Sequence, residues 1–212
     1  MFTGIIQEIG YVAKIEQKQG KKYFYITCKT LQHDLKIGES IACNGICLTV
    51  VKFSQQDIVV ETMDQTQKTT TAKDWRINTS IHLEKALALS DRLNGHLVQG
   101  HIDTTTTLIK SYEVNNTLYL AFRLPQEYAR WVVEHGSICI DGVSLTVAHL
   151  QQNVFEVALI KHTLQMTHLG KLVEENKVNI EFDIIGKYVA RLMNNNEATE
   201  QNINEAWAIK NL

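Results

Sequence analysis

Two stretches of the chain carry side chains that could do chemistry, in matching positions. Cys47 and Thr49 alternate with apolar residues in the first stretch, and Ser144 and Thr146 do the same in the second. Because the side chains of a strand alternate between its two faces, each stretch should present a nucleophile or hydrogen-bond donor opposite its apolar set. A polar pair that faces away from a core is more often merely exposed to solvent. The matching positions are what favour a shared kind of site.

His96 and His101 form a second candidate, in the glycine-rich run of residues 94–103. Histidine titrates near neutral pH, so it suits proton transfer, and flanking glycines let a ligand approach closely. A spacing of five residues fits neither one face of a helix nor one face of a strand, so no shared metal ion is expected. Cys43 and Cys47 are close together but lack a second pair, so zinc is not expected either.

These candidates occupy equivalent places in an internal repeat. The stretch 41–50 is echoed by 138–147 at an offset of 97 residues, and 4–7 is echoed by 100–103 at an offset of 96. A repeat of this length has the size of a domain, well above the roughly 20–50 residues of solenoid repeats. The sequence therefore predicts two copies of one domain, joined near residues 90–95.

Both copies are rich in short runs of β-forming residues separated by turns. Examples are residues 23–28 and 57–62 in the first copy and 154–160 in the second. This pattern is typical of small β-barrels or sandwiches. Residues 184–193 differ, because their apolar positions follow helical spacing. That helix could pack on its own domain or serve self-association, and a polar tail follows from Asn194.

The composition excludes several classes of function. The net charge of −2 argues against a nucleic-acid partner or an anionic membrane, which usually require a basic stripe. No apolar run approaches the roughly 18 residues of a membrane span, and the first residues lack the features of a signal peptide. The four cysteines show no disulfide-like pattern, so we expect a reduced, cytoplasmic protein. The residues alone indicate a duplicated β-barrel protein that binds two related small ligands, one in each copy.

Four stretches, in order and with consistent spacing, resemble the riboflavin synthase family of the alpha-chain type. They are residues 1–5, 44–50, 95–103 and 141–147, and the resemblance covers the chain from Met1 to about Met193. It implies an all-β fold of two tandem six-stranded Greek-key β-barrels followed by a C-terminal α-helix. The expected parts are an N-terminal barrel over 1–96, a C-terminal barrel over 97–183, and a trimerisation helix with a polar tail over 184–212.

The resemblance also implies a reaction. Two molecules of 6,7-dimethyl-8-ribityllumazine would react without a metal or an added cofactor, one donating a four-carbon unit to the other. The products would be riboflavin and 5-amino-6-(D-ribitylamino)uracil, in the last step of riboflavin biosynthesis. The expected assembly is a homotrimer whose active site lies between barrels of neighbouring subunits, and association with lumazine synthase is left open. The competing class is a non-catalytic lumazine- or flavin-binding antenna protein, but there the histidine-glycine stretch is eroded, whereas here both copies are intact.

Catalytic roles follow from the same resemblance. His101 and Ser144 would transfer protons or donate hydrogen bonds, with Thr146 beside them, and Cys47 would contact the second lumazine or add to it. Asp141 is grouped with these residues, although it is better suited to orienting its turn. The residues expected to contact substrate are Phe2, Thr3, Gly4, Ile5, Ile6, Ser40, Cys47, Leu48, Thr49, Glu61, Thr62, Met63, Asp64, Gln65, Thr66, His96, Gly100, His101, Ile102, His135, Ser144, Leu145, Thr146, Ile160, Lys161, His162, Thr163, Leu164 and Gln165.

Overall fold

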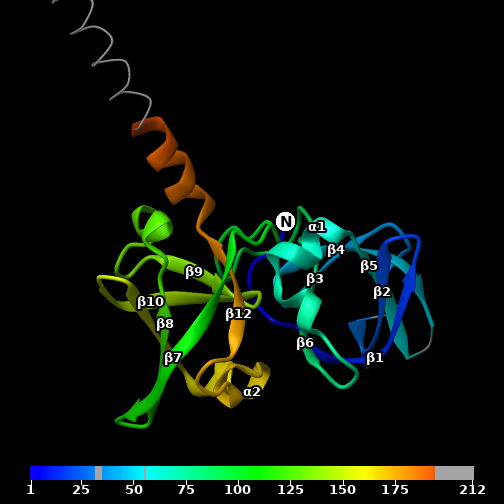
Figure 1. The fold of residues 1–212 in the computed structure, drawn as a ribbon, viewed down its shortest axis with the longest axis horizontal. Coiled ribbons are helices and arrows are strands. Elements are labelled where there is room, and N and C mark those ends of the chain that lie inside the picture. The colour runs from blue at the N-terminus through cyan, green and yellow to red at the C-terminus, as the bar shows by residue number, and fades with distance from the viewer. Residues whose placement is uncertain (32–34, 55, 194–212) are drawn as a thin grey trace, which may run out of the picture.

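The computed structural model describes residues 1–31, 35–54 and 56–193. The predicted polar tail from Asn194 lies outside the described residues. Figure 1 shows two strand-rich bodies side by side, with the N-terminus between them and the helix of residues 184–193 projecting from the second body. None of the described helices is long and apolar enough to cross a membrane.

The first body is a closed barrel with the strand order β1-β2-β5-β4-β3-β6. Its strands are β1 (Glu8–Lys18), β2 (Lys21–Thr27), β3 (Ser40–Cys43), β4 (Ile46–Phe53), β5 (Asp57–Thr62) and β6 (Ser80–Lys85). Between β5 and β6 lie a short helix, α1 (Asp64–Thr69), and a 3-10 helix, η2 (Thr71–Asp74).

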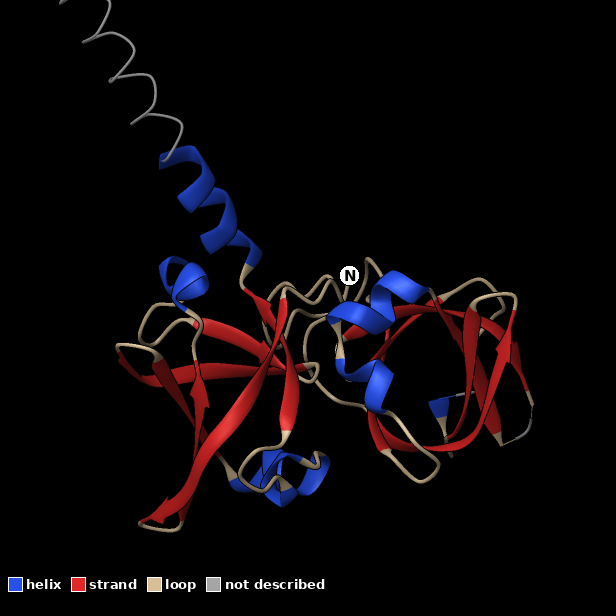
Figure 2. Cartoon of the chain, in the orientation of Figure 1, coloured by secondary structure: helices blue, strands red, loops and turns tan. Residues whose placement is uncertain are grey.

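The second body repeats this order as β7-β8-β11-β10-β9-β12. Its strands are β7 (Thr104–Val114), β8 (Thr117–Arg123), β9 (Ser137–Ile140), β10 (Val143–Gln151), β11 (Val154–Leu159) and β12 (Lys177–Phe182). Its helices are η3 (Gln126–Trp131), α2 (Lys161–Met166) and η4 (Leu169–Lys171). The described residues thus form two closed six-stranded antiparallel barrels of one topology, which confirms the predicted fold class (Figure 2).

Each barrel closes around its own apolar core, and the alternation of β4 and β10 shows how. Ile46, Leu48 and Val50 are buried in the first core, while Cys47 is half-buried and Thr49 exposed on the other face. In β10, Leu145 is likewise buried in the second core. The predicted alternation of faces is therefore confirmed. Successive side chains of a strand point to opposite faces, so the polar residues lie on the face opposite the apolar ones.

The turns before β4 and β10 explain why both copies carry glycine there. Asn44 and Gly45 have φ values of 45° and 79°, and Asp141 and Gly142 have 45° and 84°. Two successive positive φ angles define the type I′ hairpin turn, which favours Asn-Gly and Asp-Gly because its twist matches that of the flanking strands. The same turn thus positions the polar face of each barrel.

Two short segments cross between the barrels. We call residues 2–6 the N-terminal segment and residues 98–102 the central segment, which stand at equivalent places in the repeat. They meet in an antiparallel bridge between Phe2 and Val98. Ile6 then packs into the core of the second barrel, whereas Ile102 packs against the core of the first. Each copy therefore contributes a segment to the barrel of the other copy.

Candidate functional site: two polar faces with crossed segments

The first polar face is built on three neighbouring strands. Thr49 of β4 pairs with Ser40 of β3 on one side and with Glu61 of β5 on the other. Directly paired residues of a sheet point to the same face, so these three side chains line one surface beside Cys47. Strand β5 leads directly into Met63 and helix α1. The end of this strand is therefore followed by the predicted contacts Met63, Asp64, Gln65 and Thr66.

The central segment completes this face. The backbone N–H of Cys47 donates to the carbonyl of Gly100 over 2.8 Å, which brings His101 next to the first barrel. Gly100 has a φ of 81°, and a Cβ there would lie 2.5 Å from the Cβ of Cys47. Only glycine fits this close approach.

The second polar face has the same plan. Thr146 of β10 pairs with Ser137 of β9, and the backbone N–H of Ser144 donates to the carbonyl of Gly4 over 2.7 Å. A Cβ on Gly4 would lie 2.6 Å from the Cβ of Ser144. Ile160, which follows β11, is exposed beside α2, whose residues include the predicted contacts Lys161, His162, Thr163, Leu164 and Gln165.

A buried histidine supports the second face. His96 Nδ1 lies 2.7 Å from Ser144 Oγ, at hydrogen-bond distance. Burial lowers the pKa of His96, an effect that Asp183 partly opposes. The ring is therefore neutral near pH 7 and can exchange a proton with the Ser144 hydroxyl.

Two buried carboxylates hold the crossing segments. Glu84 of β6 accepts hydrogen bonds from the backbone N–H groups of Thr3 and Gly4, over 2.7 and 3.0 Å. Glu181 of β12 accepts from Gly100 and His101, over 2.8 and 2.9 Å. Desolvation raises the pKa of both carboxyls, and these hydrogen bonds partly counter it. The sequence prediction omitted both residues, although the repeat places them at equivalent positions.

The predicted site residues are divided between the two faces. His101 lies with Cys47 on the first face, whereas Ser144 is bonded to His96 on the second, so one chain does not join His101 to Ser144. Ser137 was missed in the prediction, and its signal was the offset of 97 residues from Ser40.

Several other predicted residues lie away from the outer faces. Leu48 and Leu145 point into the barrel cores, and Phe2 is buried in the junction between the barrels. Asp141 is also buried there, where its carboxylate accepts the backbone N–H of Asn179 over 2.8 Å. This hydrogen bond joins the turn of Asp141 and Gly142 to strand β12.

The remaining predicted contacts have plain positions. Thr62 is buried at the end of β5, and the Thr3 hydroxyl donates to Glu84 over 2.7 Å. Ile5 is exposed, and so is His135, which has a φ of 65° in the loop before β9. No group of three or more His, Cys, Asp or Glu side chains among the described residues could hold a metal ion.

Comparisons with known proteins agree with this duplicated architecture. The model of the lumazine binding domain matches residues 3–86 and again 99–183. The riboflavin synthase of Bacillus subtilis (strain 168) is 36% identical over 213 residues, which cover 100% of this chain and 99% of that protein. The riboflavin synthase of Mycobacterium tuberculosis (strain CDC 1551 / Oshkosh) is 39% identical over 197 residues, covering 91% and 98%.

Solved structures show the same fold. LumP complexed with 6,7-dimethyl-8-(1'-D-ribityl) lumazine has a TM-score of 0.77 and 25% identity, covering 85% of this chain and 98% of that one. LumP complexed with riboflavin has a TM-score of 0.79 and 24% identity, covering 86% and 99%. Since both barrels match the domain model and the relatives match along almost the whole chain, this chain belongs to the riboflavin synthase family, with two lumazine binding domains.

Proposed function

We propose that this chain is a transferase that converts two molecules of 6,7-dimethyl-8-ribityllumazine into riboflavin and 5-amino-6-(D-ribitylamino)uracil, the last step of riboflavin biosynthesis. The observation that carries this proposal is the pair of equivalent polar faces, each completed by a segment of the other copy. A reaction between two identical molecules requires two such sites. Holding two reactants in the correct orientation can itself lower a barrier by roughly 7–11 kcal/mol.

The second face suits proton transfer. A neutral His96 can take the hydroxyl proton of Ser144, and Ser144 Oγ can then accept a proton from the acidic methyl group of a bound lumazine. Thr146 stands on the same exposed face and can hydrogen-bond the ring. In this assignment His96 and Ser144 act as one unit.

The first face suits the partner lumazine. All four cysteines lie in the described part of the chain, and Cys47 is the one that is not fully buried. Its thiol can add to the ring or direct a water molecule to it, while Thr49 and Ser40 donate hydrogen bonds. His101 is exposed beside this face and can exchange protons with solvent.

We further assign the active site to the contact between the first barrel of one subunit and the second barrel of a neighbour in a homotrimer. The helix of residues 184–193 supports this assembly, because Ile185, Val189 and Leu192 are 60%, 50% and 64% exposed within the single chain. A second subunit would also supply the combination of His101 with Ser144 that one chain does not make.

Val189→Asp tests this assembly. A charge on the apolar stripe should dissociate the trimer and abolish turnover, since each complete site would need two subunits. Light scattering gives the mass and a lumazine assay gives the activity, with Arg191→Ala on the same helix as the matched control. A monomeric variant with full turnover would show that one chain is sufficient.

The parts of the chain follow from these roles. We assign residues 1–96 to the N-terminal barrel, 97–183 to the C-terminal barrel and 184–212 to the trimerisation helix and tail. None of the four cysteines, all in the described part of the chain, is in a disulfide bond there, which supports our proposal of a reducing compartment such as the cytoplasm.

The decisive experiment for the reaction uses the purified protein and 6,7-dimethyl-8-ribityllumazine with nothing added. We expect one riboflavin and one 5-amino-6-(D-ribitylamino)uracil for every two lumazine molecules consumed. Chromatography and absorbance measure the two products. Tight binding of lumazine without either product would instead identify a non-catalytic antenna protein.

The antenna alternative has one observation in its favour, namely the likeness to the solved structures of LumP. That likeness is 24–25% identical, whereas the riboflavin synthases compared above are 36–39% identical. The intact second face, with its bonded His96 and Ser144, also favours turnover over storage.

A further inference from the structure

The helix of residues 184–193 carries a lysine with little exposure to solvent. Lys187 Nζ lies 3.0 and 2.7 Å from the two carboxylate oxygens of Asp103, the residue that directly follows the central segment. The two side chains are only 16% and 17% exposed. Removing one member of such a pair leaves the other charge shielded from water without a partner, which is costly. The helix is therefore linked to the chain two residues beyond His101.

The first copy has the same backbone arrangement without the ion pair. Gln7 stands at the place of Asp103, and its side chain accepts the backbone N–H of Lys85 over 3.0 Å. In the second copy, Asp103 accepts the backbone N–H of Phe182 over 2.9 Å. Strand β12 leads directly into the helix that carries Lys187, whereas β6 leads into a loop (Figure 1). A neutral amide is therefore sufficient for the contact with the strand, and the charge of Asp103 serves the lysine.

The two buried carboxylates differ in a related way. Glu84 accepts the hydroxyl of Thr3 in addition to backbone N–H groups. Gln99 stands at the place of Thr3 in the second copy, and only its backbone N–H donates to Glu181, over 2.6 Å. Burial raises the pKa of Glu181, and the charge of Lys187 is one of the effects that oppose this rise. Lys187 thus favours the ionised form of Glu181, whose hydrogen bonds are stronger.

Glu181 and Asp103 both attach the central segment to β12. Glu181, on that strand, accepts the backbone N–H groups of Gly100 and His101. Asp103 donates its own backbone N–H to a carbonyl of β12 over 2.9 Å. Between these attachments, the carbonyl of Gly100 accepts the backbone N–H of Cys47 from the first polar face. The place of His101 on that face therefore depends on how the segment is attached to β12.

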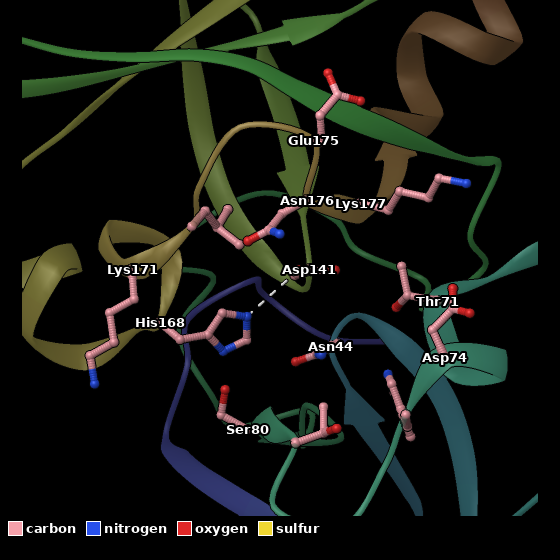
Figure 3. A pocket seen from close by; sticks show the side chains of 13 residues that line it. Asn44, Thr71, Asp74, Ser80, Asp141, His168, Lys171, Glu175, Asn176 and Lys177 are labelled. Carbon is pink, nitrogen blue, oxygen red and sulfur yellow. Dashed lines mark ion pairs between the residues drawn. The ribbon is translucent and has the colours of Figure 1, made fainter.

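Another shielded pair, in the junction between the barrels, differs in position and charge. His168 lies 3.7 Å from Asp141, and the dashed line in Figure 3 joins these two side chains. Neither residue belongs to a crossing segment, and a histidine is charged only when it is protonated. Lys187, in contrast, is charged at neutral pH and is bonded to the residue at the end of the central segment.

We propose that Lys187 is a positioning residue for the first polar face. Through Asp103 and Glu181 it ties the central segment to the helix and so holds His101 beside Cys47. This role rests on the function proposed above, because His101 and Cys47 are assigned to the reaction there. Lys187 then acts on turnover through His101.

Hydrogen exchange measured by mass spectrometry tests this role on the full-length protein without turnover. Lys187→Met removes the charge and keeps a long, unbranched side chain. We expect the backbone N–H groups of the central segment to exchange about tenfold faster or more, because their attachment to Glu181 is weakened. The N-terminal segment, which is bonded to Glu84, is the internal control and should exchange at its original rate. Arg191→Met, at an exposed position of the same helix, is the matched control.

Two further variants separate the charge from the side chain. Lys187→Arg keeps the positive charge and should restore slow exchange of the central segment. Asp103→Asn removes the ion pair from the other side, and its amide oxygen can still accept the backbone N–H of Phe182, as Gln7 does for Lys85. It should therefore reproduce the fast exchange of Lys187→Met even if that variant fails to fold.

Steady-state kinetics test whether the effect on turnover passes through His101. Lys187→Met should lower kcat about tenfold and change the KM for the lumazine by less than about threefold, and Lys187→Arg should recover most of the loss. In protein that already carries His101→Ala, the same change should lower kcat by less than about twofold, because the residue that Lys187 positions is absent. A purely structural lysine would lower kcat by the same factor in both backgrounds.

Three results would overturn this role of Lys187 even if riboflavin is formed. They are unchanged exchange of the central segment in Lys187→Met, equal acceleration in both crossing segments, and a loss of kcat that persists in full beside His101→Ala. A failure of the unchanged protein to make riboflavin would instead contradict the proposed function. Hydrogen exchange would in that case still decide whether Lys187 holds the central segment.

Discussion

The two polar faces share strands, turns and crossing segments, but they place their histidines differently. On the second face His96 is buried and bonded to Ser144, whereas on the first face His101 is exposed beside Cys47. The repeat puts Ile5 where the other copy has His101. Duplication thus kept the strands, turns and crossing segments while the histidines diverged, which fits our proposal that the two faces bind molecules with different roles.

The largest effect on stability should come from adding a side chain where a crossing segment contacts a barrel strand closely. Gly100→Ala would place a Cβ 2.5 Å from that of Cys47 at a φ of 81°, which we expect to lower the free energy of unfolding by about 3–5 kcal/mol. Urea unfolding measures this, and Gly4→Ala should match it if the two faces are equivalent.

Gly20→Ala is the control, because that glycine has a φ of 76° but a Cβ added to it would meet no atom within 4 Å. It should cost about 1–2 kcal/mol, from backbone strain alone. Equal losses for Gly20 and Gly100 would show that the contact with Cys47 does not matter.

The next effect separates the histidines. His96→Gln should reduce kcat by about 10²–10³-fold, because it removes the base bonded to Ser144. The double variant His96→Gln with Ser144→Ala should lose little more than either single variant, since the two residues act as a unit. Steady-state kinetics on the lumazine give kcat for each variant of this double-mutant cycle. Fully additive losses of kcat would contradict the proposal that His96 and Ser144 act as a unit.

His101→Ala sharpens the same comparison. We expect its turnover to fall by about 10²-fold while the dissociation constant of the lumazine changes by only about threefold, because an exposed side chain contributes to proton transfer more than to binding. Fluorescence titration gives the binding and the riboflavin assay gives the turnover. Equal losses in both would assign His101 a structural role.

The smallest effect concerns the junction between the barrels. His82 of the first copy occupies the position in the repeat that Asn179 occupies in the second copy. Burial is the main cause that lowers the pKa of His82 well below its ordinary value. The charge of the neighbouring His168 lowers this pKa further. The unfolded chain therefore binds more protons below about pH 6.5, so this contribution to stability is complete above that pH and is lost as the pH falls.

His82→Asn copies the residue of the second barrel and should remove this dependence. Between pH 7.5 and 5.5, the drop in the free energy of unfolding should be smaller in the variant by about 1 kcal/mol. Urea unfolding at the two pH values measures it. An unchanged drop would mean that His82 does not titrate differently in the folded and unfolded states.

Much of the architecture was predictable because it rests on local periodicity. The alternation around Cys47 and Ser144 predicted their exposed faces, and the Asn44-Gly45 turn is a strong local signal. The helix after residue 183 was predicted from its apolar spacing. The short helices α1 and α2 were not, since six residues are too few to show a helical period.

The sequence by itself determined that one β-barrel domain occurs twice, with matching polar faces and glycine turns. Only the tertiary structure decided which segment serves which face, because the Phe2–Val98 bridge and the bond of His96 to Ser144 join residues far apart in the chain. Periodicity reports neighbours along a strand or helix, but it carries no information about such long-range pairings. The exchange of segments, and with it the division of His101 from Ser144, therefore follows from packing between the barrels.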